Sequence, residues 1–391
     1  MSPVEQVVAS DSGRPHLDDP FALALIEADK AHGRTAPNPP IGALILKGSE
    51  VISTGYTQPA GEDHAEIVAL KRAGRRARGA HMYVTMEPCC THGLTPPCTD
   101  AIIAAGIAGV SVGIIDPNPS VSGKGLASLA KAGIPTNVNH GARFRRPVAG
   151  FAKRLSVGQP YVTSKWAMTL DGKSATGGGQ SKWITSKESR ELAHDLRDKV
   201  DAIVIGVGTA LADDPQLTPR PPRPHRPARS NPLRVVLDPR ARTPVDGRLV
   251  RTDDQDRTVI AFGPKAPRER LDRLIFAGVE FVAVPFEEPP AVARFVLEWL
   301  AEQGVNEVLV EGGSETHWSF LAEGLVDEIW AFIGAKIAGG RTALPAVGGE
   351  GFSSLDQLNV TAVRTLQIGA DALLTADIES EWRRTQWSHE S

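Results

Sequence analysis

All three cysteines of the chain, Cys89, Cys90 and Cys98, lie within ten consecutive positions of a 391-residue sequence. An odd number of clustered thiols cannot form a closed set of disulfides and is more typical of metal binding or thiol chemistry. His64 lies upstream of this cluster. One imidazole and two thiolates would leave the fourth position of a tetrahedral zinc ion open to water. The residue types therefore favour a catalytic zinc site.

Glu66, two residues after His64, is the expected proton carrier of such a site. Residues two apart do not share a helix face, so both side chains can reach one point only beyond the N-terminal end of a helix. Glu66 would then pass a proton from the zinc-activated water to the leaving group. Cys98 precedes an apolar helix, whose dipole favours the thiolate form that a metal requires.

Other interpretations of these residues remain open at this point. Asp63 and Glu66 could form a capping box at a helix start, His64 could be structural, and the cysteines could hold a purely structural zinc. Cys89 and Cys90 also compete for one ligand position. We favour Cys89 because it directly follows a proline, as in the His-x-Glu and Pro-Cys pattern of zinc deaminases.

The sequence pattern around these residues predicts the helices and strands that must position them. A helix is expected from Pro20 to Gly33 with Asp19 as its cap, two strands around a turn at 47–48, and a short helix from His64 to Gly74. Further strand and helix patterns follow, so residues 20–145 predict one α/β domain. Residues 1–19 are expected to be a flexible tail, and 146–160 a linker with little helix or strand pattern.

The second half repeats strand, glycine turn and helix over residues 161–385, which is typical of a mostly parallel sheet with covering helices. We expect strands at 161–168, 200–206, 233–238, 257–263, 279–286, 307–313 and 326–337, and helices at 186–199, 291–304 and 317–325. A buried strand that runs into Gly312 and Gly313 before a helix could bind phosphate, or could be a tight turn without a ligand.

Composition limits the class of protein. A formal net charge of −3 argues against a nucleic-acid partner. The sequence shows no charged-then-apolar leader and no run of about 18 apolar residues, so we expect a cytoplasmic protein without a membrane partner. In residues 218–232, Arg220, Arg223, Arg226 and Arg229 recur at every third position among prolines. This segment is either a basic arm for phosphates or a solvated surface loop.

The first half resembles the cytidine-deaminase superfamily, and within it the deaminase domain of the bifunctional riboflavin-biosynthesis deaminase/reductases. The matching stretches are PNPPIGALI (37–45), GEDHAEIVAL (61–70), VTMEPC (84–89), THGLTPPC (91–98) and DPNPSVSGKG (116–125). The resemblance implies an α/β/α deaminase fold in which zinc is held by His64, Cys89 and Cys98, with Glu66 as the proton shuttle. It implies substrate contacts from Asn38, Asp116, Asn118 and Lys124.

Two positions depart from that family. Leu94 stands where its members usually carry a lysine or arginine suited to gripping the substrate phosphate, which leaves Lys124 as the candidate for that contact. Cys90 stands where its members usually carry no cysteine.

The second half lacks a G-x-G-x-x-G motif after a strand, so a Rossmann dehydrogenase is not expected. SKWAMTLDGK (164–173), SKWITS (181–186), GVGTALADDPQLTPR (206–220) and VEGGSETHWSFLAEGLVDEI (310–329) resemble the reductase domain of the same family, which has a dihydrofolate-reductase-like α/β fold and uses NADPH. The resemblance implies substrate contacts from Lys165, Ser181, Arg197, Leu217, Arg220 and Glu311. It implies NADPH contacts from Ala167, Trp183, Thr209, Asp213, Gly313, Ser314, Glu315, Thr316, His317, Trp318 and Ser319.

The leading hypothesis is therefore a two-step enzyme of riboflavin synthesis that takes a small phosphorylated pyrimidine, with zinc and NADPH as cofactors, and that forms a homo-oligomer. A nucleic-acid base deaminase that grips its substrate with the basic arm is one rival, and a non-catalytic zinc-stabilised binding protein is another. A third possibility is that only one half is active.

Overall fold

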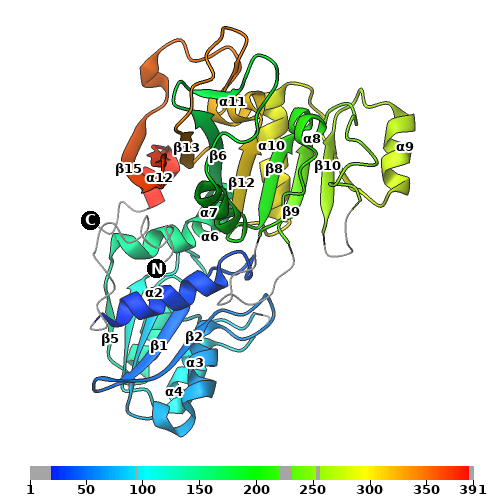
Figure 1. Cartoon of the computed structure of the whole chain (residues 1–391). Coiled ribbons are helices and arrows are strands. Elements are labelled where there is room, and N and C mark those ends of the chain that lie inside the picture. The colour runs from blue at the N-terminus through cyan, green and yellow to red at the C-terminus, as the bar shows by residue number, and fades with distance from the viewer. Residues whose placement is uncertain (1–18, 94, 221–230, 252–255, 387–391) are drawn as a thin grey trace. The chain divides into compact units, whose positions relative to one another are not determined.

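The computed structural model describes residues 19–93, 95–220, 231–251 and 256–386. These residues fall into two compact units that divide between Gly158 and Gln159, and Figure 1 traces both. Three parts of the predictions lie outside the described residues: residues 1–18 of the tail predicted at 1–19, Leu94, and the arginines 223, 226 and 229 of the predicted basic arm. No helix within the described ranges combines the length and the hydropathy that a bilayer crossing requires.

The first unit contains a five-stranded sheet in the order β2-β1-β3-β4-β5. β1 (Gly42–Lys47) is antiparallel to β2 (Glu50–Tyr56) and to β3 (His81–Met86), whereas β3, β4 (Gly109–Ile114) and β5 (Thr136–Val138) run parallel. The helices of this unit are α2 (Pro20–Ala31), α3 (Ala65–Ala73), α4 (Cys98–Ala105), α5 (Lys124–Lys131) and α6 (Arg145–Val157), with short 3₁₀ turns at Gly74–Ala77 and Ala142–Phe144.

Two glycines allow α2 and α3 to lie directly on this sheet. A Cβ on Gly42 would lie 1.9 Å from the carbonyl oxygen of Ala24 in α2, and a Cβ on Gly55 would lie 2.3 Å from the carbonyl oxygen of Ala65 in α3. Gly55 pairs with Ala43, the neighbour of Gly42, so the two glycines face opposite sides of the sheet. The helices therefore cover both faces, which confirms the predicted α/β/α layers.

The second unit contains a nine-stranded sheet in the order β11-β10-β9-β8-β12-β6-β13-β16-β15. Seven strands run parallel: β6 (Tyr161–Thr169), β8 (Ala202–Gly206), β9 (Leu233–Leu237), β10 (Thr258–Phe262), β11 (Glu280–Ala283), β12 (Glu307–Gly312) and β13 (Glu328–Gly334). β15 (Val360–Ile368) and β16 (Asp371–Ile378) form an antiparallel hairpin beside β13, and β7 (Lys173–Ala175) pairs with β14 (Leu344–Pro345) as a separate ribbon.

Helices cover both faces of this sheet (Figure 1). α10 (Pro289–Glu302) and α11 (Ser314–Ala322) pack on one face, and α7 (Lys187–Arg197), α8 (Val207–Asp213) and α9 (Arg268–Phe276) pack on the other. A short helix α12 (Glu381–Gln386) and a 3₁₀ turn at Leu355–Gln357 complete the unit. Alternate residues of β8 show the pattern. Val204 packs in the apolar cluster that includes α10 and α11, whereas Ile203 and Ile205 pack in the cluster that includes α7, α8 and α9. Burial on both faces explains why the parallel strands are nearly continuous apolar runs.

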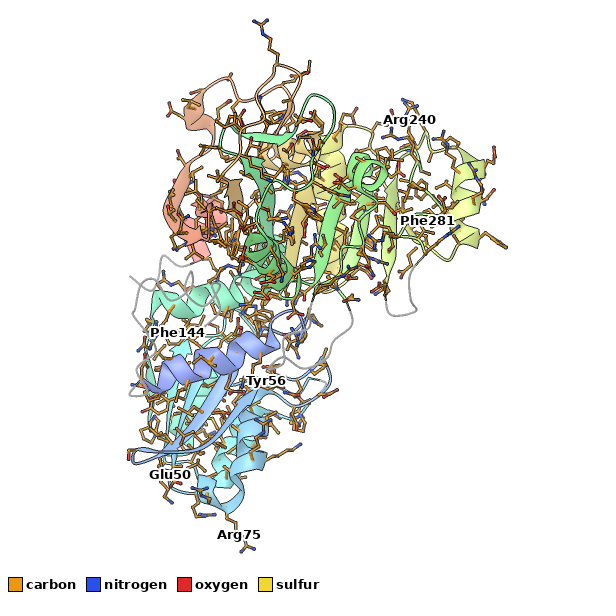
Figure 2. The ribbon with its side chains drawn as sticks, viewed as in Figure 1. Glu50, Tyr56, Arg75, Phe144, Arg240 and Phe281 are labelled. Carbon is orange, nitrogen blue, oxygen red and sulfur yellow. The ribbon has the colours of Figure 1, made fainter. Side chains whose placement is uncertain are left out.

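The structure contains several elements that were not predicted. Residues 146–157, expected to belong to a linker with little helix pattern, lie in the 13-residue helix α6, which begins at Arg145. The apolar stripe of α6 is short and comprises Val148, Ala149 and Ala152. Basic residues interrupt it, so the sequence does not show a clear helical period of apolar residues. The 3₁₀ turn before it places Phe144, labelled in Figure 2, 4.9 Å between ring centroids from Phe21 of α2. The hairpin β15–β16 and the helices α5, α8 and α9 were likewise not predicted.

Candidate active sites

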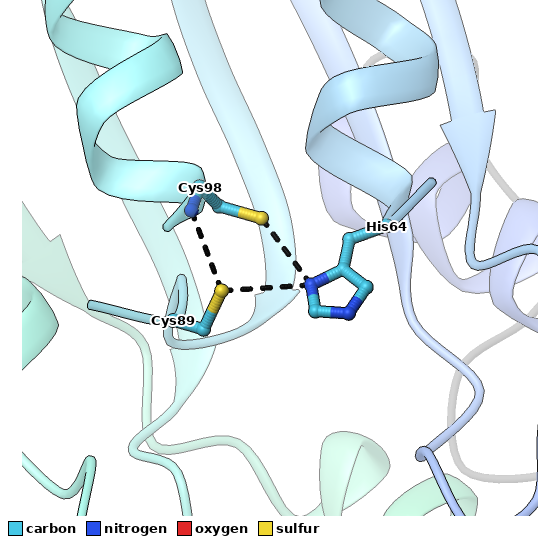
Figure 3. Close-up of side chains that lie close together, drawn as sticks. All are labelled: His64, Cys89 and Cys98. Atoms are coloured by element: carbon cyan, nitrogen blue, oxygen red, sulfur yellow. Dashed lines mark hydrogen bonds between the residues drawn. The ribbon is translucent and has the colours of Figure 1, made fainter. Parts of the chain in front are cut away.

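The three predicted metal ligands meet at one point (Figure 3). Nδ1 of His64 lies 3.5 Å from the Sγ of Cys89 and 3.3 Å from the Sγ of Cys98, and the backbone N–H of Cys98 donates to the Cys89 sulfur over 3.3 Å. His64 is the residue before α3 and Cys98 is the first residue of α4, so two helix starts and the segment after β3 converge here. Cys90 is half-buried and does not belong to this cluster.

The spacing of these donor atoms fits zinc. A tetrahedral ion with Zn–N of about 2.0–2.1 Å and Zn–S of about 2.3 Å holds its nitrogen and sulfur ligands about 3.5 Å apart. Both measured N···S distances, 3.5 and 3.3 Å, are close to that separation. Three protein ligands leave one tetrahedral position for a further ligand, as in catalytic zinc sites. Cys89, the cysteine favoured from the sequence, belongs to this cluster, and Cys90 does not.

The pKa values of these groups indicate an ion pair within the ligand cluster. The hydrogen bond with Cys89 raises the pKa of His64 to about 9. The hydrogen bond from Cys98 lowers the pKa of Cys89 to about 4, while the shared bond and burial raise the pKa of Cys98 above its ordinary value. One thiolate is therefore present at neutral pH beside a histidine that it keeps protonated. A divalent cation would replace those protons, because zinc binds thiolates and neutral imidazole.

Glu66, the second residue of α3, is only 4% exposed. Burial raises its pKa to about 7, and the negative charge of Cys89 acts in the same direction. Its carboxyl group also hydrogen-bonds with Cys98, so it lies beside the ligand cluster as expected. The capping-box interpretation is wrong, because α3 has no side-chain cap and the Asp63 carboxylate accepts from Lys71 over 2.5 Å.

The segment between β4 and α5 brings three of the predicted substrate contacts together. Asp116 is buried, and burial raises its pKa to about 7, with the charges of Glu87, Cys89 and Glu66 adding to the effect. Asn118 accepts from the Ser120 N–H and hydroxyl, and the Lys124 ammonium donates to the Ser120 carbonyl over 2.9 Å.

The other predicted contact of this half, Asn38, lies half-buried in the turn before β1, where the Thr35 hydroxyl donates to its carbonyl over 3.0 Å.

Sequence reasoning missed Glu87, which is 2% exposed and accepts three backbone hydrogen bonds from residues of the segment 116–126. Its signal in the sequence is a carboxylate directly after an apolar strand and directly before Pro88 and Cys89.

In the second unit, Glu311 lies at the end of β12 and binds two predicted substrate residues. Nε and Nη2 of Arg197 donate to its two oxygens over 2.5 and 2.7 Å, and Nζ of Lys165 on β6 lies 3.4 Å away. Burial raises the pKa of Glu311, but the charges of Arg197 and Lys165 outweigh it and hold the pKa well below its usual range. The three side chains form a buried cationic cluster with one carboxylate.

Two further predicted substrate residues, Arg220 and Leu217, lie in different surroundings. The charges of Arg220 and Arg197 both act on His194, whose pKa burial lowers to about 4 and whose ring contacts the Thr218 carbonyl over 3.2 Å. The side chain of Leu217 packs in an apolar core cluster instead of facing solvent.

Ser181 donates to Asp213 over 3.3 Å, so a predicted substrate contact and a predicted cofactor contact are neighbours.

The predicted cofactor residues divide between two environments. Gly313 caps α11, and a Cβ placed on it would lie 3.3 Å from the Thr209 hydroxyl oxygen, so α8 and the start of α11 meet. The buried Thr316 faces Gly206, and the buried His317 ring contacts the Ser164 hydroxyl over 2.8 Å.

The other predicted cofactor residues make contacts with different parts of the unit, except Ser314, which also lies at the start of α11. Glu315 accepts from the Gly349 N–H over 3.1 Å, and the Trp318 ring lies 5.0 Å between centroids from Phe352. Trp183 is 61% exposed under the guanidinium of Arg190, while Ala167 lies on β6. Ser314 opens α11, and Ser319 donates to the Glu315 carbonyl.

The fold and the ligand cluster define a zinc-binding deaminase domain followed by a second α/β domain. Residues 17–114 match the family described as "Cytidine and deoxycytidylate deaminase zinc-binding region", and residues 160–374 match the "RibD C-terminal domain". The chain is 40% identical over 354 residues to the riboflavin biosynthesis protein RibD of Aquifex aeolicus (strain VF5), covering 90% of this chain and 96% of that protein. It therefore belongs to the RibD family of riboflavin biosynthesis proteins.

Further comparisons agree. RibD of Escherichia coli (strain K12) is 37% identical over 370 residues, covering 90% of this chain and 97% of that protein. The structure of Acinetobacter baumannii RibD, form 1, superposes with a TM-score of 0.81 at 31% identity, over 92% of this chain and 98% of that one.

A Thermotoga maritima diaminohydroxyphosphoribosylaminopyrimidine deaminase/5-amino-6-(5-phosphoribosylamino)uracil reductase superposes with a TM-score of 0.78 at 32% identity, with the same coverages of 92% and 98%. The predicted family is confirmed, and with it the class of enzyme: a deaminase and a reductase of riboflavin biosynthesis on one chain.

Proposed function

We propose that the chain catalyses two successive steps on one phosphorylated pyrimidine. The first unit would deaminate 2,5-diamino-6-(5-phosphoribosylamino)pyrimidin-4(3H)-one by hydrolysis, and the second would reduce the ribosyl group of the product to a ribityl chain with NADPH. The observation that supports this most directly is the convergence of His64, Cys89 and Cys98 beside a buried carboxyl group, Glu66. Such a set of donors with an adjacent acid is suited to hydrolytic removal of an amino group.

In the deaminase unit, His64, Cys89 and Cys98 would hold the zinc. A zinc ion there supplies Lewis-acid activation of water at neutral pH. Glu66 would accept a proton from the attacking water and return it to the departing amino group. Because burial raises its pKa, Glu66 can hold a proton nearer neutrality than an exposed carboxyl group can. The burial of Glu66 keeps that proton from exchanging freely with bulk solvent.

In the reductase unit, the cations of Arg197, Lys165 and Arg220 would bind the phosphate and hydroxyl groups of the substrate, because guanidinium groups fork onto phosphate oxygens. The start of α11 offers free backbone N–H groups to a dinucleotide phosphate. Thr209 lies close enough to Gly313 that a side chain at 313 would contact it, so glycine keeps the backbone accessible. NADPH supplies the hydride when bound.

The decisive experiment compares ammonia release by the native chain and by Glu66→Gln, which keeps the shape of the side chain but removes its acid. We expect a loss of about 10²–10⁴-fold in the deamination rate. Zinc content and NADPH oxidation with the deaminated substrate serve as controls, and both should be retained. Unchanged ammonia release in the variant would contradict the role of Glu66, and no release by either protein would favour a non-catalytic binding function.

We further propose that the protein acts in the cytoplasm as a homo-oligomer, with a small molecule and no nucleic acid as partner. Three free cysteines without a disulfide agree with a reducing compartment. β15 lies at the end of the nine-stranded sheet, and residues 360–365 are exposed, so its edge offers unpaired backbone groups to a second copy. Light scattering of the purified chain would measure the assembly, and a monomer at micromolar concentration would contradict it.

A further inference from the structure

We propose that Glu87 is a positioning residue of the deamination site, whose carboxylate fixes the segment 116–126 beside the metal-ligand segment. This inference rests on the proposed deaminase function, because the segment 116–126 carries Asp116, Asn118 and Lys124, the expected substrate contacts. Glu87 would touch neither metal nor substrate. It would act through the backbone of the segment that does.

The contacts of Glu87 use both of its oxygens. Oε2 accepts from the Gly123 N–H over 2.8 Å and from the Asp116 N–H over 3.2 Å, and Oε1 accepts from the Leu126 N–H over 3.0 Å. The side chain is 2% exposed, so these bonds form away from water. Hydrogen bonds to an ionised group are roughly twice as strong as neutral ones. A single carboxylate therefore holds the first, middle and last parts of the segment.

One of these bonds replaces a helix cap. α5 begins at Lys124, and its cap residue is Gly123, which has no side chain to accept from the free N–H groups of the first turn. Glu87 accepts from Leu126, the third residue of the helix, and so supplies the missing acceptor from a different part of the chain. A negative charge there also suits the helix dipole. The start of α5 is thereby bonded to Glu87 as well as to its own preceding loop, where the Lys124 N–H donates to the Val121 carbonyl over 2.8 Å.

A second observation shows how closely the two segments approach. A Cβ placed on Gly125 would lie 2.1 Å from the carbonyl oxygen of Pro88 and 3.1 Å from Oε1 of Glu87. Real Cβ contacts are not shorter than 3.0 Å, so only glycine fits while the backbone of α5 touches the residue before Cys89. The helix thus packs directly on the segment that carries a metal ligand, independently of the hydrogen bonds of Glu87.

The topology explains why this contact matters for the site. β3 and β4 are parallel neighbours, Met86 pairs with Ile114, and the Glu87 N–H donates to the Ile114 carbonyl over 2.9 Å. The metal-ligand segment and the segment 116–126 therefore leave the sheet at the same edge. Asp116 lies near enough to the ligand cluster for the charges of Cys89 and Glu66 to act on it. Fixing its backbone fixes the distance between substrate contact and metal.

Two variants test the proposal by different means. Glu87→Gln keeps the shape but turns one acceptor oxygen into an N–H₂ group that faces a backbone donor, and Gly125→Ala wedges α5 away without changing any charge. For both we expect kcat/KM for deamination to fall about 10–100-fold, mainly through a higher KM for the pyrimidine. Zinc content per chain should stay that of the native protein, and NADPH oxidation with the deaminated substrate should be unchanged.

Asp238→Asn is the matched control. Asp238 is another fully buried carboxylate that accepts a backbone N–H, from Thr243 over 2.7 Å, but it belongs to the other unit. It should leave the KM for deamination unchanged.

The outcomes distinguish a failure of the positioning role from a failure of the proposed deaminase function. A native KM in Glu87→Gln and Gly125→Ala would overturn the positioning role. So would a loss of zinc with a native KM in the fraction that keeps it, because Glu87 would then support only the metal segment. Absence of ammonia release by the native chain would instead overturn the proposed function itself.

Discussion

Replacing the buried pair of Arg197 and Glu311 with apolar residues separates its contribution to stability from its contribution to substrate binding. The carboxylate of Glu311 is 5% exposed and the side chain of Arg197 is 17% exposed, and two hydrogen bonds of 2.5 and 2.7 Å join them. Lys165 completes the cluster at 3.4 Å with 14% exposure. The test uses the single variants Arg197→Met and Glu311→Leu and the double variant.

The expected energies follow from burial. Glu311→Leu leaves the cations of Arg197 and Lys165 without their counterion, and an unpaired buried charge destabilises a protein by about 3–5 kcal/mol. Arg197→Met should destabilise the protein less, because Lys165 still pairs with Glu311. The double variant leaves Lys165 as the single cation of the cluster, so we expect it to be no less stable than Glu311→Leu. The coupling energy is then at least the destabilisation caused by Arg197→Met, within the range of about 0.5–3 kcal/mol for residues in direct contact.

The pH dependence has a definite sign. The pKa of Glu311 in the folded chain lies below its ordinary value of 4.5, so its ionised form stabilises the fold. This contribution is complete above pH 4.5 and is lost as the pH falls through the lower folded value. The stability difference between the native chain and Glu311→Leu should therefore be constant near neutrality and should narrow only below about pH 4.

The assay is urea unfolding at pH 7 followed by tryptophan fluorescence. All seven tryptophans lie at or after Trp166, so the signal reports on the reductase unit even if the two units unfold separately. Reductase activity should be lost in all three variants, because the cation is absent or misplaced in each. Ammonia release should be unchanged in all three. A double variant destabilised by the sum of the singles would refute the coupling, and recovered reductase activity in it would refute the substrate role.

Three further outcomes follow from the geometry. Gly55→Ala should push α3 off the sheet, since its Cβ would meet the carbonyl of Ala65, and should destabilise the deaminase unit by about 1–3 kcal/mol; chemical unfolding followed by ammonia release checks this. Cys98→Ser should lose bound zinc, as measured by metal analysis after dialysis, while NADPH oxidation persists. Burial lowers the pKa of His317 to about 3, so the free energy of unfolding should fall by about 2 kcal/mol between pH 7 and 5 as this histidine becomes protonated in the unfolded chain. In His317→Asn, this decrease in the free energy of unfolding should be smaller.

The metal site could be predicted because its signals are local. His64 and Cys98 lie at the starts of helices that the apolar period predicts, and Cys89 closely follows the predicted strand at 81–86. Each ligand is thus fixed by the element next to it, and the spacing of the three residue types indicates what they hold. The parallel strands of the second unit could be predicted for the same reason. Because both faces of these strands are buried, their sequences are uninterrupted runs of apolar residues.

The anchoring contacts could not be predicted because they are made at long range. Glu87 is bonded to backbone N–H groups 29, 36 and 39 positions away, and a backbone donor has no sequence signature. Glu311 meets Arg197 over 114 positions, although the resemblance pointed to both residues separately. The helix α6 was missed for a different reason, because basic residues interrupt a stripe of only a few apolar side chains. In each case the deciding partner is supplied by tertiary packing.

The two units place a buried carboxylate at the same topological position, where a parallel strand ends beside its neighbour. Glu87 follows β3 and Glu311 lies near the end of β12, and each binds groups from segments beyond the adjacent strands. Their partners differ in kind. Neutral N–H groups satisfy Glu87, and nothing charged is left for a ligand to exchange with it, so its effect is confined to geometry. Glu311 instead binds the cations of Arg197 and Lys165, and a phosphate or sugar hydroxyl of a substrate can compete with it for them. This carboxylate therefore sets both the positions of these cations and how much of their charge a substrate can use. Changes at Glu87 should therefore act mainly on KM, whereas changes at Glu311 should affect both substrate binding and the stability of its unit.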